Sequence, residues 1–403
     1  MAGLGLSVIG NIADRWRELS GENNWKGLLD PLDFDLRSSI LNYGDRAVAI
    51  GDAYNNKKYE DLHGFSRFPP NELFTKVGVR ARNEFDYNVT DFIYSRLEAQ
   101  LFGIVIEDES TWCAYVAVAT DDGKKKLGRR DIVVSWRGTI LPGEKLEDVE
   151  FIPIPASDMF PNNNNDPLIH SGFHQIYTTE KDNSIYNKKS ARDQVLNAVS
   201  KLVDQYKDEE VSITVTGHSL GSALATLNAM DIVYKGINKP TGTANKSFPV
   251  TAIVFASPMV GNEGFKKVFD ELSDIHVLRV ENAKDPVPTL PPNKLIVIPQ
   301  HRYYHVGESL PIDTTLSPFL KTSDVNPHDL NVYLHGVAGT QGSKGGFNLD
   351  YPLDTALINK TVDGLNEKHN YNIPPNWWVE ENNGMVLQDD GTYKAEFYIP
   401  DAP

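Results

Sequence analysis

The stretch VSITVTGHSLGSALATLNAM, residues 211–230, decides how this chain is expected to fold. Its first six residues are rich in β-branched side chains and predict a buried strand, whereas SALATLNAM predicts a helix of small side chains. Between them stands Gly217-His218-Ser219-Leu220-Gly221, a G-x-S-x-G sequence. A turn of this kind from strand to helix holds its serine in a strained conformation, with glycines where larger side chains would block it. Ser219 is therefore the candidate nucleophile, and the alternative is a serine that only occupies a turn.

The rest of the chain alternates between strand-like and helix-like segments. Between residues 110 and 340, apolar β-rich runs such as DIVVSWRG and VTAIVFASPMVG alternate with helical runs such as ARDQVLNAVSKLVDQY. This alternation predicts βαβ units around a mostly parallel sheet, and hence an α/β fold. In that helical run four residues share one face that is expected to pack on the sheet. They are Val195, Val199, Leu202 and Val203.

The chain is expected to form one domain over residues 1–403. A helical covering segment is expected at 1–100, the catalytic core at 110–340 and a second covering segment at 341–403. The sequence DDGKKKLGRR, residues 121–130, predicts an antiparallel hairpin with a glycine turn. Its lysine run, Lys124 to Lys126, is expected to be solvated at the hairpin tip, and the alternative is a patch for lipid head groups.

The composition restricts the classes of partner. The 403 residues carry 39 basic and 55 acidic side chains, which gives a formal net charge of −16. Nucleic-acid binding needs a basic face, so this class of partner is not expected. The single cysteine, Cys113, excludes an internal disulfide. No apolar run reaches the roughly 18 residues of a membrane span, and the first residues show no secretory signal pattern, so the expected location is the cytoplasm.

A serine hydroxyl needs a base to take its proton, and in this type of fold an acid and then a histidine follow the serine along the chain. The predicted strand DIHVLRVEN is followed by Asp285, which stands between Lys284 and Pro286 on a stiff loop. Asp285 is the candidate acid, and the alternative is a solvated loop carboxylate. Its rivals are Asp270, Asp274 and Asp313.

Two later histidines compete for the role of base. His328 follows Pro327 at the expected start of a helix, and His335 lies seven residues further on, inside that helix. Both fall on one helix face, so periodicity does not separate them. Catalytic histidines of this fold lie on a loop over the carboxyl edge of the sheet, which favours His328. Three other histidines are expected to be structural, namely His218 and, within a predicted strand, His301 and His305.

Five short sequences resemble those of the class 3 lipases: VSWRGT, IHSGF, VTGHSLGSALATL, NAKDPVP and HDLNVYLH. The whole chain is similar to the plant cytosolic phospholipase A1 group of that family. The resemblance implies an α/β-hydrolase fold with Ser219, Asp285 and His328 as a catalytic triad. It also implies hydrolysis of the sn-1 acyl ester of phospholipids, or of galactolipids or acylglycerols, without a metal or organic cofactor. Asn326-Pro327 stands where related proteins often carry a bulky aromatic residue.

Acyl transfer also requires donors for the oxyanion that develops on the ester carbonyl. The backbone N–H of Leu220, directly after the nucleophile, is one expected donor. The resemblance implies Thr139 as the second, and the alternative is that Trp136-Arg137-Gly138 is simply a strand end. Arg137 is expected to be a buried anchor.

In the lipases that the chain resembles, the segment after this strand end is the lid. Here it reads LPGEKLEDVEFIPIPASDMF, residues 141–160. Its apolar side chains Leu146, Val149, Phe151 and Ile152 would let an acidic protein meet a membrane or micelle surface by hydrophobic contact. The alternative is an ordinary packed loop.

Two other functions share these residues. An acyltransferase would use the same triad and transfer the acyl group to an alcohol or amine instead of water. A binding or signalling module would keep the fold without catalysis, and the presence of all three triad candidates counts against it.

Overall fold

The computed structural model of the chain describes residues 11–56, 62–96, 110–138, 151–243 and 245–349, with residues 351, 353, 358, 364–366, 385–387 and 393–395. The helices are α1 (Ile12–Leu19), α2 (Phe34–Ala53), α3 (Leu73–Lys76), α4 (Val79–Arg82), α5 (Asp121–Leu127), α6 (Ser171–Thr178), α7 (Ala191–Gln205), α8 (Leu220–Tyr234), α9 (Glu263–Glu271) and α10 (Leu330–Gly339). The longer strands are β1 (Tyr87–Arg96), β2 (Ser110–Ala119), β3 (Arg130–Trp136), β6 (Val211–His218), β7 (Val250–Phe255), β9 (Ile275–Asn282) and β11 (Glu308–Ile312). The short ones are β4 (Pro153–Pro155), β5 (Leu168–His170), β8 (Gly261–Asn262), β10 (Tyr303–Tyr304), β12 (Met385–Leu387) and β13 (Tyr393–Ala395).

Seven of these strands form the central sheet, in the order β1-β2-β3-β6-β7-β9-β11. The pairs from β3 through β11 are parallel, and β1 and β2 extend the sheet in the antiparallel sense. The predicted α/β class with a mostly parallel sheet is therefore confirmed. The carboxyl ends of the parallel strands meet at one edge of the sheet, which we call the carboxyl edge. In such sheets, ligands bind at this edge because the loops that leave it converge there.

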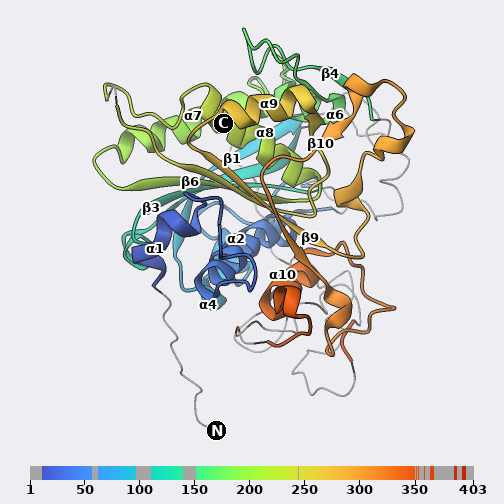
Figure 1. Ribbon diagram of the computed structural model, residues 1–403. Helices are drawn as coiled ribbons and strands as arrows, with labels where there is room; N and C mark the ends of the chain where they lie inside the picture. Colours follow the sequence, from blue (N-terminus) through green and yellow to red (C-terminus); the bar gives the residue numbers. More distant parts are fainter. Residues whose placement is uncertain are drawn as a thin grey trace.

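Helices cover both faces of the sheet (Figure 1). One face carries α6, α7, α8 and α9, and the other carries α1, α2, α4 and α10. Each face has its own apolar core, one built around α7 and α8 and the other around α2 and α10. The predicted inward face of α7 is confirmed, because Val195, Val199, Leu202 and Val203 are all buried.

The N-terminal helices cover one face of the sheet, but residues 87–96 of the expected helical covering segment form β1, an edge strand of the sheet itself. The longest, α2, begins at a cap in which the Asp33 carboxylate accepts the backbone N–H groups of Asp35 and Leu36. It packs against β3, β6, β7 and α10. Most of the predicted C-terminal covering segment falls outside the described residues.

A small second sheet, in the order β10-β8-β5-β4, stands beyond the carboxyl end of β7. It links three distant parts of the chain: the second half of the predicted lid with the segment directly after it, the segment after β7 and the segment before β11. Asn262 fixes one of these junctions, because its side-chain amide donates to the carbonyls of Asp166 and Gln300.

The connection between β2 and β3 differs from the predicted hairpin. The two strands are antiparallel neighbours, but residues 121–127 form the helix α5 instead of a glycine turn. Thr120 caps its first turn, which also carries two aspartates, and the lysine run fills its last turn. These charges favour a helix because they oppose the partial charges at its two ends. Lys124, Lys125 and Lys126 lie within 3.0, 3.4 and 3.8 Å of acidic side chains.

A buried ion pair joins α7 to α8, the two helices around which one of the apolar cores is built. The Arg192 guanidinium donates two hydrogen bonds to Asp231, over 2.7 and 2.8 Å, and Tyr177 donates a third over 3.2 Å. The Asp231 side chain is fully buried, and among the described residues these donors are what compensates its charge.

We expect Asp231→Ala to lower the free energy of unfolding by about 3–5 kcal/mol, because it leaves the Arg192 charge buried without its partner. Chemical denaturation measures this difference. Asp270→Ala serves as the control, since it removes the exposed pair with Lys266 and should cost under about 1 kcal/mol. Equal losses in the two variants would contradict the assignment of Arg192–Asp231 as a structural pair.

Candidate active site

Ser219 occupies the turn between β6 and α8 and has a positive φ of 58°, with ψ of −124°. This backbone conformation is strained for any residue with a side chain. A Cβ on Gly217 would lie 2.4 Å from the Gly221 carbonyl oxygen, and a Cβ on Gly221 would lie 2.3 Å from that of Trp136. Both glycines are therefore required by the close approach of backbone to backbone, as the G-x-S-x-G sequence predicted.

Neighbouring side chains and backbone hold this turn in place. The Ser219 N–H donates to the Phe255 carbonyl over 3.0 Å. The Ser222 hydroxyl bridges to the same residue, since it donates to the Phe255 carbonyl over 2.6 Å and accepts its N–H over 3.1 Å. The strained serine is thus attached to the carboxyl end of β7 as well as to its own strand.

The structure brings the three candidate catalytic side chains together. The Ser219 Oγ lies 2.9 Å from His328 Nε2, and His328 Nδ1 lies 2.7 Å from Asp285 Oδ2. A carboxylate only accepts, so Nδ1 carries the proton of the neutral ring and Nε2 is left to accept the serine hydroxyl. All three residues are buried.

The Asp285 carboxylate is held by two further donors. Its Oδ1 accepts the Val287 N–H over 2.9 Å, and its Oδ2 accepts the Tyr333 hydroxyl over 2.6 Å. Burial and the negative charge of Asp285 raise the pKa of Tyr333, so this phenol stays protonated and remains a donor. Tyr333 is not among the residues predicted from the sequence. The available signal was its position in the helix that follows His328, four residues after the helix cap.

His328 stands directly before α10, on the loop that the sequence predicted. Asp329 caps the helix by accepting the N–H groups of Asn331 and Val332. The Asn326 side chain accepts the His328 N–H over 3.0 Å, and the Pro327 carbonyl accepts from Asn282 over 2.9 Å. Asn326 and Pro327 therefore fix this loop through hydrogen bonds.

His218 contacts the same loop from the elbow side. Its Nε2 lies 2.7 Å from the His328 carbonyl oxygen, and the two rings are 4.6 Å apart. Burial, and secondarily the neighbouring His328, lower the pKa of His218 well below 6.5, so the ring is neutral and Nε2–H is the donor. The predicted structural role thus takes the form of a direct contact with the backbone of the candidate base.

The other histidines lie away from Ser219. His335 is fully buried and shares a hydrogen bond of 2.7 Å with Ser317, and burial lowers its pKa to about 4. His301 ends a 3-10 turn and His305 follows β10, so the prediction that both lie within one strand is wrong. Pro299 begins the short 3-10 turn at 299–301, so the strand does not start before Tyr303.

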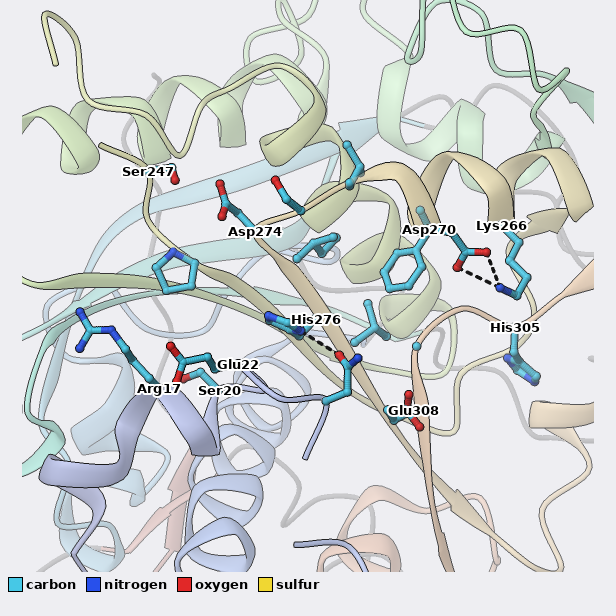
Figure 2. Close-up of a pocket in the computed structure, with 18 residues that line it drawn as sticks. Arg17, Ser20, Glu22, Ser247, Lys266, Asp270, Asp274, His276, His305 and Glu308 are labelled. Atoms are coloured by element: carbon cyan, nitrogen blue, oxygen red, sulfur yellow. Dashed lines mark hydrogen bonds and ion pairs between the residues drawn. The ribbon is translucent and has the colours of Figure 1, made fainter. Parts of the chain in front are cut away.

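The rival aspartates also lie elsewhere. Asp270 forms an ion pair with Lys266 on α9, and Asp313 accepts the Thr315 N–H in a short turn. Asp274 lines a cavity of about 650 Å³ at the amino ends of β7 and β9 (Figure 2). None of the three candidate catalytic residues lines this cavity, which lies at the opposite edge of the sheet from Ser219.

Of the two expected oxyanion donors, the structure describes Leu220 but not Thr139. Leu220 is the first residue of α8, and none of the described residues accepts a hydrogen bond from its N–H. Thr139 lies outside the described residues, but Gly138 before it is packed so closely that a Cβ there would lie 2.8 Å from the His218 carbonyl oxygen. Arg137 is half-buried and donates to the carbonyls of Trp112 and Gly138 over 2.9 and 3.2 Å, which agrees with an anchoring role.

The predicted lid is described only in its second half, residues 151–160, which includes β4 and the buried Ala156, Met159 and Phe160. Leu146 and Val149 lie outside the described residues. Phe151 is half-buried and packs edge-on against His170 at 5.5 Å, whereas Ile152 is 51% exposed. Of Phe151 and Ile152, only Ile152 presents an apolar side chain to solvent.

A parallel sheet with helices on both faces and a strained serine between a strand and a helix at its carboxyl edge defines an α/β-hydrolase. The profile of the family described as Lipase (class 3) matches residues 133–295. Phospholipase A1-II 1 of Oryza sativa subsp. indica is 46% identical, over 96% of this chain and 97% of its own length. Phospholipase A1-IIgamma of Arabidopsis thaliana is also 46% identical, over 96% of this chain and 94% of its own length.

Among solved structures, the lipase from Rhizopus microsporus var. chinensis matches 72% of this chain and 78% of its own, with 19% identity and a TM-score of 0.46. The relatives of high identity and nearly complete coverage decide the family. This chain belongs to the class 3 lipases, in the group that contains the plant phospholipases A1-II.

We expect Tyr333→Phe to lower kcat on a short soluble ester by about tenfold, because a hydrogen bond to a charged group is removed from Asp285. Steady-state kinetics measures this loss. The control is Tyr43→Phe. It removes a tyrosine hydroxyl that donates over 3.0 Å to another buried carboxylate, that of Asp131. If both variants lose the same fraction of turnover, Tyr333 acts only through stability.

Proposed function

We propose that this protein is a serine acylhydrolase that cleaves the sn-1 acyl ester of phospholipids. The continuous contact from Ser219 Oγ through His328 to Asp285, over 2.9 and 2.7 Å, carries this proposal. Relatives named phospholipase A1 that are 46% identical over nearly the whole chain support the choice of substrate.

In the proposed reaction, His328 Nε2 takes the Ser219 proton while Oγ attacks the ester carbonyl carbon. The oxyanion is then stabilised by the N–H of Leu220 and by Thr139, each donor contributing on the order of 3 kcal/mol. His328 returns its proton to the leaving lysophospholipid oxygen, which leaves an acyl group on Ser219. Water, deprotonated by the same nitrogen, attacks this acyl-enzyme and releases the fatty acid.

Asp285 stabilises the imidazolium that forms on His328 in each half of this cycle. Hydrogen bonds from Tyr333 and Val287 hold the Asp285 carboxylate in position, so it does not have to move as the positive charge develops on His328. His218 holds the backbone of His328 from the other side, over 2.7 Å, and keeps the ring within reach of Ser219.

The proposed substrate requires contact with a lipid surface. Among the residues that the structure describes, no helix is long and apolar enough to cross a membrane. The described half of the proposed lid, with Ile152 exposed, supports access from such a surface. We propose a cytoplasmic location, because the chain has a single cysteine, the buried free thiol of Cys113, and so does not rely on an internal disulfide.

We expect Ser219→Ala to abolish covalent labelling by a fluorophosphonate probe and to leave the melting temperature within a few degrees of the wild type. The substitution removes the nucleophile and little packing. Gel fluorescence and a thermal scan measure the two outcomes. Labelling that persists in the variant would assign the nucleophile to another residue.

The two histidines of the α10 region separate catalysis from stability. We expect His328→Ala to lower turnover by roughly 10²–10⁴ with little change in melting temperature, since the base is lost. His335→Ala should retain turnover at low temperature but lose about 1–3 kcal/mol of stability, because a packed and hydrogen-bonded ring is removed. The reverse result, with a stable but inactive His335 variant, would transfer the role of base to His335.

A further inference from the structure

Exposed apolar side chains gather on the same side of the molecule as Ser219. The large apolar residues that are most exposed among the described ones are Ile152, Ile185, Leu295, Val297, Ile298, Tyr304 and Leu316. Leu316 follows the carboxyl end of β11, and Ile185 lies beside Ser184, whose hydroxyl bonds Ser110 at the start of the antiparallel β2. Both positions belong to the carboxyl edge.

The densest group lies on the loop of residues 293–302, which reads NKLIVIPQHR. Leu295 is 71% exposed, Val297 91% and Ile298 49%. Single exposed apolar residues are ordinary on a protein surface, but three within four consecutive positions form a patch. In Figure 1 this loop belongs to the orange stretch that leads to β10.

The loop is closed at its base and projects from a fixed frame. The Asn293 side chain donates to the Tyr303 carbonyl and accepts the Tyr303 N–H, both over 2.8 Å. The Gln300 carbonyl accepts from Asn262 over 3.2 Å, and the Leu290 carbonyl accepts from Met259 over 2.8 Å. The exposed side chains are therefore presented by a structured loop and do not depend on an unfolded segment.

The exposed apolar loop carries a local positive charge, although the chain as a whole is acidic. The chain has 55 acidic residues in 403, yet none occurs between Asp285 and Glu308. The segment carries Lys294 and Arg302, which are exposed and form no ion pair with any described residue. A protein with a net charge of −16 is repelled by an anionic surface at long range. It can approach such a surface best through an exposed segment that carries cations and no acids.

The small sheet connects this loop to the rim of the candidate active site. It runs in the order β10-β8-β5-β4, so β10 after the loop and β4 after Ile152 are its two edge strands. Three strand spacings put these edges about 14 Å apart. Ile152 lies within the proposed lid, and the loop follows Asp285 along the chain after the short 3-10 turn at Val287–Thr289.

We propose that residues 294–302 are the interfacial anchor of this enzyme, which inserts Leu295, Val297 and Ile298 into a lipid surface while Lys294 and Arg302 contact its anionic head groups. This inference rests on the proposed function, because a lipid surface is then also the source of the substrate. An apolar tip flanked by cations matches a membrane interface. Apolar side chains enter the acyl region of the lipid, and lysine and arginine side chains remain among the phosphates.

The test measures binding to vesicles that the enzyme does not hydrolyse. Vesicles of ether-linked phosphatidylcholine, alone or equimolar with ether-linked phosphatidylglycerol, are sedimented with the protein. The variants are the triple change Leu295→Ser, Val297→Ser and Ile298→Ser, the pair Lys294→Ala and Arg302→Ala, and the control Leu316→Ser. The control removes an apolar side chain that is 48% exposed on the same edge but outside the loop.

We expect the triple variant to lower the partition coefficient on both vesicles by roughly ten- to hundredfold, since three apolar side chains no longer enter the lipid. The charge pair should lower binding by roughly five- to tenfold only on vesicles that contain phosphatidylglycerol, and salt should remove this difference. Unchanged binding of the triple variant, or an equal loss in Leu316→Ser, would overturn the proposal.

Turnover of a short soluble ester separates this inference from the proposed function. All loop variants should keep the wild-type kcat on that ester and its melting temperature, because none of their residues touches Ser219, His328 or Asp285. Absence of ester turnover in the wild type would refute the proposed function. Vesicle binding that is lost together with soluble-ester turnover in the triple variant would refute the anchor, since the loop would then act on the site itself.

Discussion

The close backbone approach at the turn between β6 and α8 is the constraint on which the site depends. Gly221 comes so near the end of β3 that any side chain there would collide with the Trp136 carbonyl, and Gly217 meets the Gly221 carbonyl in the same way. Because β6 is the central strand of the sheet, the turn meets both neighbouring strands: β3 through this contact and β7 through the hydrogen bond from Ser219 to Phe255. The strain at Ser219, with φ of 58°, is sustained by a rigid core and not by the turn alone.

The carboxylate of Asp285 is the second point at which distant segments meet. It receives hydrogen bonds from a histidine before α10, a tyrosine within α10 and the backbone of its own loop. Each donor lowers the cost of keeping the charge buried, and together they fix the loop after β9 against α10. His218 completes this arrangement, since it ties the backbone of His328 to the residue that precedes Ser219.

The carboxyl edge combines the reactive groups with the exposed apolar side chains. This distribution suits an acidic enzyme with a lipid substrate, because hydrophobic contact does not depend on net charge and the exposed Lys294 and Arg302 provide a local attraction. The opposite edge, with the polar cavity of Figure 2, carries the carboxylates of Glu22, Asp274 and Glu308. The two edges of the same sheet therefore differ in the kind of surface that they can approach.

The sequence by itself determined the features that depend on local pattern. Alternating runs predicted the parallel sheet, and the glycines around Ser219 predicted the strained turn, because backbone sterics act between near neighbours. Only the tertiary structure separated His328 from His335, since the two share a helical spacing and differ in which partner, Ser219 or Ser317, lies opposite. Tyr333 and the projecting loop at 293–302 were likewise decided by contacts between segments far apart in the chain. The helix at 121–127 was predicted as a hairpin turn because the segment contains a glycine. The charged residues at the two ends of the segment stabilise a helix instead.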